Sequence, residues 1–516
     1  MRRLASLLLA ACLALSLTGC LAQEEEPPAP SESPSAAPSD SPKTLRFSLG
    51  YDPTASLHPI TGTSQVNQEL TGLVYQGLYE LDNSFTPRPA LVQSAAPSQD
   101  GTLWTFTLKT DVLFSDGTPL TAQHAAASLN AARQGGPYAQ RLSGVAAVTA
   151  VDDATLTIAL SAPNGALPAL LDVPVVLEQE GAFAPLGSGR YQYETAGERL
   201  YLHVNPNCPA AAALPYSTIP LTPVSSADER IAAFDCGDIT AVTTEFSSPY
   251  ALGYSSSYEA CGYPTTTLLY LGFQTARGAC QSPLVRQAVS RALDRETIVQ
   301  TLLSGHGDPA CLPISPLHGD YDGEAAALLA YDLEEAALLL AQAGYEPSEE
   351  DGLLYRRRAP LELTLLVNSD NEARQGAAEA LAEALRALGA AVTVRTLPWS
   401  SYTAALARGD FDLYIGEVRL TGDFDPAPLL TGALNYGGYS SQDAALALAQ
   451  WRAAQGEART EAARALCAQL AQDVPIAPLC FKRGSLLVRW GMVSNLQPTR
   501  ANPFYRMEDW STTSNR

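Results

Sequence analysis

LELTLLVNSDNEARQGAAEALAEALRALGAAVTVRTLPWSSYTAALARGDFDLYIGEV occupies residues 361–418 and repeats one pattern. Three short apolar runs are typical of buried strands, and two amphipathic runs between them are typical of helices closed by glycine. Strands are expected at 361–367, 391–397 and 411–418, and helices at 372–388 and 400–409. Strands and helices that alternate through short connections predict a parallel sheet with right-handed crossovers. The sequence therefore predicts an α/β fold.

The helical pattern also occurs before this segment. Ser282 followed by Pro283 is an N-cap with proline at the first helical position. Asp332 with Glu335 resembles a capping box, and Gly344 is placed to end that helix. More helices are therefore expected to accompany the sheet.

The N-terminal half has a different pattern, with alternating strands and turns. Strands are expected at 45–49, at 104–108 and twice within 148–160. Asp116-Gly117 supplies the positive φ of a tight turn. Thr121 then caps a helix expected to run to about Ala132.

The composition is that of a globular protein with a strong acidic excess. Of 516 residues, 46% are apolar and 17% are charged, and the net charge is −22. This length allows two or more domains with their own cores. Proteins that bind nucleic acid carry basic patches, so a nucleic-acid partner is not expected.

The first residues have the features of an export signal. Arg2 and Arg3 precede an uncharged apolar run at 4–17, which is too short to span a bilayer comfortably. The run ends in LTGC, residues 17–20, which resembles the lipobox of bacterial lipoproteins. That resemblance makes 1–19 a signal peptide and Cys20 the lipidated residue; a plain secretory signal with an incidental cysteine is the alternative.

A tether is expected directly after this cysteine. Residues 20–43 are rich in proline, serine and glutamate. Such a composition cannot bury enough apolar surface to offset the entropy of ordering, so the segment is expected to be disordered. A lipid, a tether and a globular body together hold a domain at the outer face of a membrane.

The remaining cysteines and the histidines give no pattern of a metal site. Seven cysteines follow Cys20, so at least one is unpaired within the chain, and their pairing is left open. They are Cys208, Cys236, Cys261, Cys280, Cys311, Cys467 and Cys480. Cys-x-x-Cys and His-x-x-x-His spacings are both absent from the sequence, and we expect no metal and no cofactor.

Several motifs occur in a fixed order over residues 45–510. They are VYQGLY (74–79), PRPALV (87–92), DGTLWTFTL (100–108), VLFSDGTPLTA (112–122), VRQAVSRALDRE (285–296) and AQAGY (341–345). The set resembles the extracellular solute-binding proteins of family 5, the peptide- and nickel-type receptors of ABC transporters. Two departures are Gln123-His124, where an acidic pair is usual, and His58, where asparagine is usual.

The resemblance implies a two-lobe periplasmic-binding-protein-like fold of type II, with an extra subdomain and a hinge between the lobes. Lobe I would combine 44–83, 187–264 and 481–513, the subdomain on it would be 84–186, and lobe II would be 265–480. Binding would then shift an equilibrium between open and closed lobes, with no bond broken.

The function implied is capture of a short peptide and its delivery to the permease subunits of an ABC importer by a monomer. A nickel complex, haem or an oligosaccharide is the alternative ligand, and peptide sensing is the alternative role. An exported hydrolase is less favoured, because Gly-x-Ser-x-Gly, Ser-x-x-Lys and His-Glu-x-x-His are all absent from the sequence.

The resemblance also singles out two candidate ligand-binding residues. In the family's peptide receptors, an aspartate after the strand matching 411–418 pairs with the peptide's α-amino group. Asp423 matches that position, although Leu420 stands where the family usually has tryptophan. Asp425 is the rival, and its place directly before Pro426 is also typical of a turn former.

Overall fold

The structure is a computed structural model, and it describes residues 46–245 and 253–512. The signal peptide, Cys20 and the tether lie outside the described residues. Within the described ranges, none of the helices combines the length and apolar character needed to traverse a bilayer.

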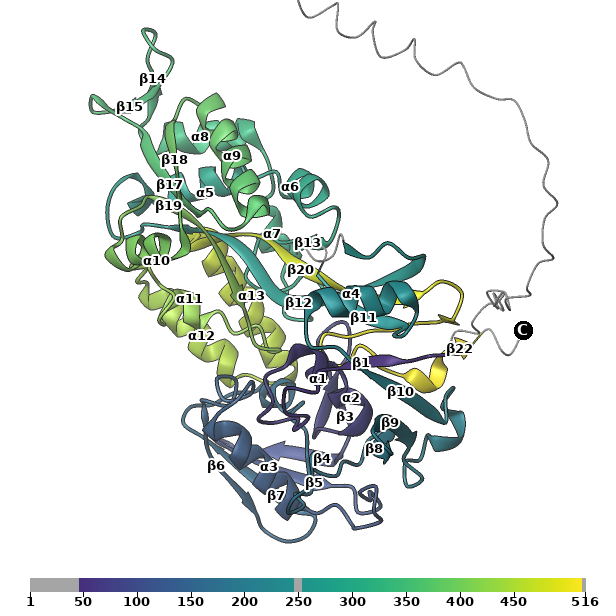
Figure 1. Cartoon of the computed structure of the whole chain (residues 1–516). Helices are drawn as coiled ribbons and strands as arrows, with labels where there is room; N and C mark the ends of the chain where they lie inside the picture. The colour runs from purple at the N-terminus through teal and green to yellow at the C-terminus, as the bar shows by residue number, and fades with distance from the viewer. Residues whose placement is uncertain (1–45, 246–252, 513–516) are drawn as a thin grey trace, which may run out of the picture. The chain divides into compact units, whose positions relative to one another are not determined.

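The largest sheet has seven strands and carries the C-terminal half of the chain (Figure 1). Its order is β11 (Ala241–Thr244), β20 (Ile476–Arg489), β12 (Tyr258–Phe273), β19 (Leu413–Arg419), β17 (Glu362–Asn368) and β18 (Ala391–Leu397), with β13 (Gly307–Pro309) on β20. β17 pairs in parallel with both β18 and β19. The parallel sheet predicted from residues 361–418 is therefore confirmed.

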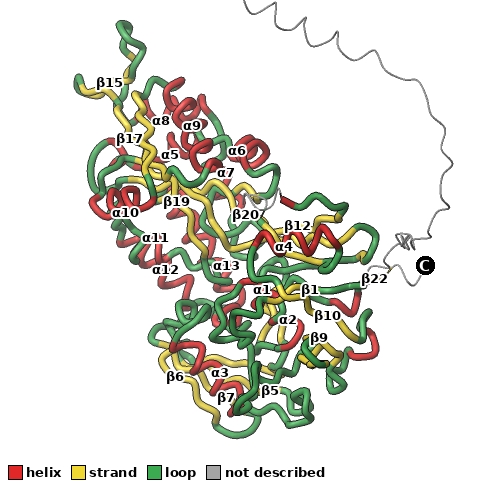
Figure 2. Tube along the Cα trace, viewed as in Figure 1, coloured by secondary structure: helices red, strands yellow, loops and turns green. Residues whose placement is uncertain are grey.

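Helices accompany this sheet, and Figure 2 shows them gathered around β17 and β19. They are α5 (Pro283–Arg291), α6 (Arg295–Leu302), α7 (Gly323–Ala327), α8 (Leu333–Gln342), α9 (Glu372–Ala387), α10 (Trp399–Arg408), α11 (Ala427–Leu430), α12 (Gln442–Ala453) and α13 (Gly456–Asp473). The predicted caps act as expected at α8, where the Asp332 side chain accepts a hydrogen bond from the Glu335 backbone N–H. Asp294 caps α6 in the same way, so the Asp294-Arg295 motif joins two helices.

Two four-stranded sheets form the N-terminal part. One has the order β1 (Leu49–Tyr51), β10 (Thr218–Pro223), β9 (Arg199–Val204), β8 (Tyr191–Ala196), and the other β4 (Val92–Pro97), β5 (Leu103–Leu108), β7 (Thr155–Leu160), β6 (Val145–Ala150). The strand expected at 45–49 is shifted, because the pairing with β10 begins only at Leu49. α3 (Ala122–Gln134) begins at the predicted cap, Thr121, whose capping box is completed by His124.

The other elements are three helices and three small sheets, β2-β3, β14-β15-β16 and β21-β22. They are α1 (Gln65–Glu69), α2 (Thr71–Val74), α4 (Ala227–Cys236), β2 (Tyr79–Leu81), β3 (Pro87–Pro89), β14 (Glu346–Pro347), β15 (Leu354–Arg356), β16 (Ala359–Pro360), β21 (Val493–Ser494) and β22 (Ser511–Thr512). Gly187 and Gly189 allow the chain before β8 to approach α2: a Cβ at Gly187 would lie 2.0 Å from the Val74 carbonyl oxygen. This glycine-rich motif therefore serves packing.

The buried apolar side chains form two large clusters. The C-terminal core runs from Leu268 to Phe481 and also includes Phe85. The N-terminal core runs from Phe47 to Leu221 and is completed by Ala241 and by side chains from Leu486 onward. β20 contributes side chains to both clusters, and β12 pairs with it along much of its length, with a register shift between Pro264 and Leu268. Long paired strands with a local irregularity are suited to carry the chain from one core to the other.

Candidate functional site

A cavity of about 510 Å³ is bordered by the N-terminal core, which contributes Tyr75, Tyr79 and Tyr138. Thr267 and Arg419, which adjoin the C-terminal core in sequence, also line it. Its wall includes α1 and α2, β2, the turn at 499–503, the middle of β12 and the end of β19. Both polar and aromatic side chains line it. Its volume is within the usual range for small-molecule sites, about 300–1,000 Å³.

Each carboxylate on the cavity wall has a basic partner. Glu69 pairs with Arg230 at 2.5 Å and also accepts a hydrogen bond from the Thr243 hydroxyl. The other pairs are Glu80 with Arg190 (3.8 Å), Glu245 with Lys482 (3.4 Å) and Asp172 with Arg141. The acidic groups of the wall are therefore already compensated.

The arginines of the wall are not all compensated. Arg141 is bound to Asp172, but in the described part of the chain no acceptor lies within hydrogen-bonding distance of the Arg419 or Arg500 guanidinium. Burial lowers the pKa of Arg500 to about 10, and the positive charges of Arg141 and Arg419 act in the same direction. The charges of Arg141 and Arg419 therefore both act against that of Arg500.

Five tyrosines give the wall flat apolar faces with polar ends: Tyr75, Tyr79, Tyr138, Tyr263 and Tyr505. Burial raises the pKa of Tyr138 to about 12, so its hydroxyl remains a hydrogen-bond donor at neutral pH. Such side chains can contact the backbone of an extended ligand without reading its side chains.

Asp423 lies beside the cavity and does not line it. Its loop follows β19 and packs against Leu81 and Ala169. A Cβ at Gly422 would lie 2.8 Å from Leu81 Cδ1 and from the Ala169 carbonyl oxygen. Since Leu81 also lines the cavity, this loop and the cavity share a wall residue.

The Asp423 carboxylate is 4% exposed and accepts hydrogen bonds from Asn164 Nδ2 (3.4 Å) and the Thr421 hydroxyl. In the described ranges no lysine or arginine nitrogen lies within ion-pair distance of it. Burial raises the pKa of Asp423, the neighbouring Asp425 raises it further, and the two hydrogen bonds act in the opposite direction.

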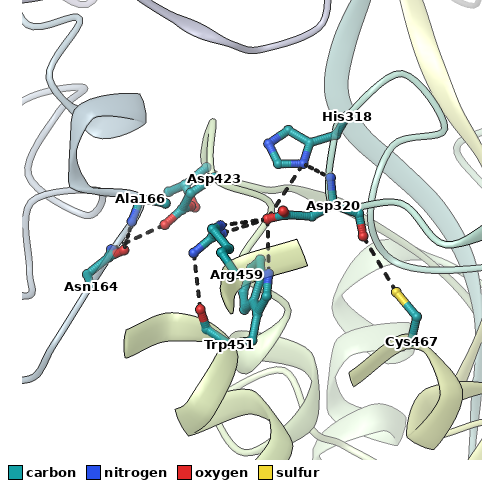
Figure 3. Close-up of polar contacts among 9 residues, drawn as sticks. Asn164, Ala166, His318, Asp320, Asp423, Trp451, Arg459 and Cys467 are labelled. Carbon is teal, nitrogen blue, oxygen red and sulfur yellow. Dashed lines mark hydrogen bonds and ion pairs between the residues drawn. The ribbon is translucent and has the colours of Figure 1, made fainter. Parts of the chain in front are cut away.

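The positive charge of Arg459 also acts on Asp423, but this side chain is already engaged (Figure 3). Arg459 Nε donates to Asp320 Oδ2 at 2.8 Å, and Trp451 Nε1 donates to the same oxygen at 3.0 Å. Figure 3 shows Asp423 facing Asn164, while Arg459 points to Asp320. Asp423 is therefore a buried carboxylate without its own cation.

Asp425 has a structural partner. Its carboxylate accepts a hydrogen bond from Arg452 Nε at 2.9 Å and caps the backbone N–H of Ala427 at 3.0 Å. The structure thus brings the two candidate aspartates close together in one loop but gives them different surroundings. The hydrogen bond from the Ala427 N–H agrees with the other interpretation of Asp425, that it forms a turn.

The arginines of the cavity were missed by the sequence analysis. Arg419 could have been singled out, because it directly follows the predicted strand 411–418, and ligands of open α/β sheets bind outside the carboxyl ends of the strands. Arg141 and Arg500 lie in turns without periodicity, and nothing local marks them. All seven cysteines after Cys20 are free thiols, and no cluster of three metal-ligating side chains occurs in the ranges described.

Comparisons with known proteins agree with this architecture. The family model described as "Bacterial extracellular solute-binding proteins, family 5 Middle" matches residues 86–441. The oligopeptide-binding protein AppA of Bacillus subtilis (strain 168) is 23% identical over 89% of this chain and 90% of its own length. The glutathione-binding protein GsiB of Escherichia coli (strain K12) is 25% identical over 56% of this chain and 59% of its own.

Solved structures show the same fold. The unliganded open form of MppA, a periplasmic murein tripeptide-binding protein, has a TM-score of 0.75 at 21% identity, covering 92% of this chain and 99% of its own. NikZ from Campylobacter jejuni, in complex with Ni(L-His), has a TM-score of 0.61 at 19% identity, covering 90% and 99%. The expected two-lobe periplasmic-binding fold is confirmed, and the chain belongs to the bacterial extracellular solute-binding proteins of family 5.

Proposed function

We propose that this protein captures a short peptide between its two lobes and delivers it, chemically unchanged, to the permease subunits of an ABC importer. The observation that carries the proposal is the cavity of about 510 Å³, which is lined by tyrosines and charged groups from segments far apart in the chain. Several matched proteins are named for peptides: oligopeptides, a murein tripeptide and glutathione. The lobe boundaries proposed are 44–83, 187–264 and 481–513 for lobe I, 84–186 for its subdomain, and 265–480 for lobe II.

Asp423 is proposed as the partner of the peptide's α-amino group. An ammonium enclosed between lobes needs a carboxylate, or its desolvation is uncompensated. Asp423 is the better of the two candidates, because Asp425 is already bound to Arg452. A ligand amine would reach Asp423 past Leu81, the residue shared by the loop and the cavity wall.

The second candidate ligand is a metal chelate. NikZ was solved with Ni(L-His), and a chelate of an amino acid also carries carboxylates that unpaired arginines could bind. The membrane anchor is proposed at Cys20, with 20–43 as the tether. Cys20→Ala should release the protein from membranes and abolish fatty-acid labelling; persistent labelling would exclude this anchor.

The experiment that tests the function is native mass spectrometry of the protein purified without denaturation, followed by calorimetry with each recovered ligand. Recovery of intact short peptides that rebind with micromolar or tighter affinity supports peptide capture. Recovery of a nickel chelate selects the second candidate. Steady cleavage of added peptide would place the protein among hydrolases.

A further inference from the structure

The turn at 489–492, between β20 and β21, exposes a tryptophan. Trp490 is 69% exposed, more than any other large apolar side chain in the described ranges. Its indole makes neither a hydrogen bond nor a ring contact with the part of the chain that the structure describes. Since an aromatic side chain stabilises a fold when it is buried, this exposed indole adds little to the stability of the protein.

The backbone fixes the direction in which this side chain is presented. Gly491 has a φ of +73°, which suits the third position of a type II turn over residues 489–492. The Trp490 N–H donates to the Ser257 carbonyl at 3.2 Å, and the Gly491 N–H donates to Glu259 Oε1 at 3.0 Å. The turn is therefore bonded to the start of the neighbouring strand, β12.

The same turn lies beside the place where the described chain begins. The Arg489 N–H donates to the Thr240 carbonyl, and the Thr240 N–H donates to the Ser48 carbonyl, both at 2.9 Å. Segments bonded side by side in this way are about 4.8 Å apart, so roughly two such spacings separate Arg489 from Ser48. The proposed tether, residues 20–43, ends a few residues before Ser48 and so reaches the fold next to Trp490.

The segment that begins with this tryptophan carries no charge. Residues 490–499, WGMVSNLQPT, contain no acidic or basic side chain, although the net charge of the chain is −22. Within this segment β21 pairs with β22, whose residues Ser511 and Thr512 are also uncharged. A surface that covers charged side chains must desolvate them, which is unfavourable. The neighbourhood of Trp490 can be covered without that cost.

We propose that Trp490 inserts into the headgroup region of the bilayer to which the protein is tethered, so that the body rests on the membrane at the base of its tether. Tryptophan favours the membrane interface, because its ring is apolar while its N–H can stay hydrated. A coil as long as residues 20–43 spans on average roughly 25–30 Å, which keeps the tryptophan at a high local concentration near the bilayer. The inference rests on the proposed lipid anchor at Cys20.

The test measures quenching of tryptophan fluorescence by lipid. The full-length lipidated protein is reconstituted into phosphatidylcholine vesicles whose acyl chains are brominated near the headgroups, and its emission is compared with that in unbrominated vesicles. Bromine quenches only an indole that it approaches closely, so Trp490→Phe should remove most of the quenching. The quenching should be the same at low and high salt, because the contact depends on the indole and not on charge.

Trp399→Phe is the matched control. Trp399 is 56% exposed at the start of α10, and Figure 1 shows α10 and β22 on opposite sides of the structure. A body that only tumbles on its tether would bring both indoles to the bilayer equally often. Quenching that survives in Trp399→Phe and is lost in Trp490→Phe therefore supports a fixed contact. Thermal melting of each variant verifies that it is folded.

The outcomes separate the contact from the anchor. If the wild-type protein does not float with the vesicles in a density gradient, the anchor at Cys20 is wrong and the inference fails with it. If the protein floats but Trp490→Phe is quenched as strongly as wild type, or Trp399→Phe loses as much quenching as Trp490→Phe, the anchor stands and the membrane contact is wrong. Trp490 does not line the cavity, so peptide affinity should be the same in wild type and Trp490→Phe.

Discussion

Arg295 and Arg500 carry the same charged group in two regions of the molecule, and their surroundings are opposite. In the C-terminal core, Arg295 is 5% exposed and donates to the carbonyls of Ala310, Pro478 and Ser290 at 2.7–3.1 Å. On the cavity wall, Arg500 is partly buried and donates to no described acceptor. Burial of a cation alone therefore does not reveal its role, whereas the hydrogen bonds that its donors make do.

Arg286 shows that the arrangement at Arg295 is not isolated. Its guanidinium donates to the carbonyls of Val474, Cys280 and Gln281 at 2.8–3.1 Å, again with no carboxylate partner. Both residues belong to the VRQAVSRALDRE motif at 285–296. That motif therefore joins α5 to the end of α13 and α6 to β20 through buried hydrogen bonds, and it is part of the fold, not of the ligand site.

The largest effect is expected from Arg295→Met. The substitution keeps an unbranched apolar stem but leaves several buried carbonyls without a donor, and each unsatisfied group costs about 1–3 kcal/mol. We expect the free energy of unfolding to fall by about 3–5 kcal/mol, the cost of leaving two or three such groups unsatisfied. Urea unfolding of the ligand-free protein measures this change, with Arg408→Gln as the control, because Arg408 is exposed at the end of α10. A loss under about 1 kcal/mol would contradict the role assigned to Arg295.

The second effect concerns ligand affinity. Asp423→Asn removes the charge proposed to bind the peptide's α-amino group and should weaken binding by more than about tenfold, from a cost of roughly 2–5 kcal/mol. N-acetylated peptide, which lacks the ammonium, should bind wild type and variant alike. Asp425→Asn is the matched control in the same loop. Affinity within about twofold of wild type for free peptide would remove Asp423 from the site.

The third effect concerns the stability of the protein without ligand when Arg500 is replaced. Arg500→Gln should leave the ligand-free protein as stable as wild type or slightly more stable, within about 1 kcal/mol, because no partner is orphaned. Arg141→Gln is expected to be destabilising by more than this, since it leaves Asp172 buried without its cation. Both are measured by urea unfolding without ligand. A large loss of stability in Arg500→Gln would mean that Arg500 is structural after all.

The elements of the fold were more predictable from the sequence than the residues of the cavity. The strands and helices of 361–418 were predictable because periodicity and caps are local, and the structure reproduces β18 at the expected residues 391–397. The strand expected at 45–49 was displaced because pairing with β10, a distant partner, decides where β1 begins.

The site was less predictable, because it is assembled across the chain. Arg419 follows a predicted strand and could have been noticed, whereas Arg500 owes its position to a turn fixed by Gly72, far away in sequence. Asp423 was chosen by resemblance, and the sequence contained no sign that it would be buried beside Asn164. Local patterns therefore determined the elements, and only tertiary structure brought the charged groups together.

The smallest effect is a pH dependence of stability at Asp423, and its sign separates a buried unpaired acid from a paired one. Burial raises the pKa of Asp423 above 3.8, its ordinary value in the unfolded chain. The folded protein therefore holds this proton more tightly than the unfolded chain does. Between 3.8 and the raised folded pKa, stability falls as pH rises; below 3.8 the carboxyl is protonated in both states and imposes no cost.

Asp423→Asn removes this cost while keeping one acceptor for Thr421 or Asn164. The variant should therefore gain stability relative to wild type at pH 7, by no more than about 1 kcal/mol, the worth of one such hydrogen bond. The gain should shrink as the pH approaches 3.8. Urea unfolding of both proteins at pH 7, 5.5 and 4 measures it, with Asp425→Asn, which loses its partner Arg452, expected to show no gain at pH 7. A gain that grows toward acid would mean that the folded protein holds Asp423 as a stabilised carboxylate. The carboxylate that pairs with the ligand's ammonium would then have to be sought elsewhere on the cavity wall.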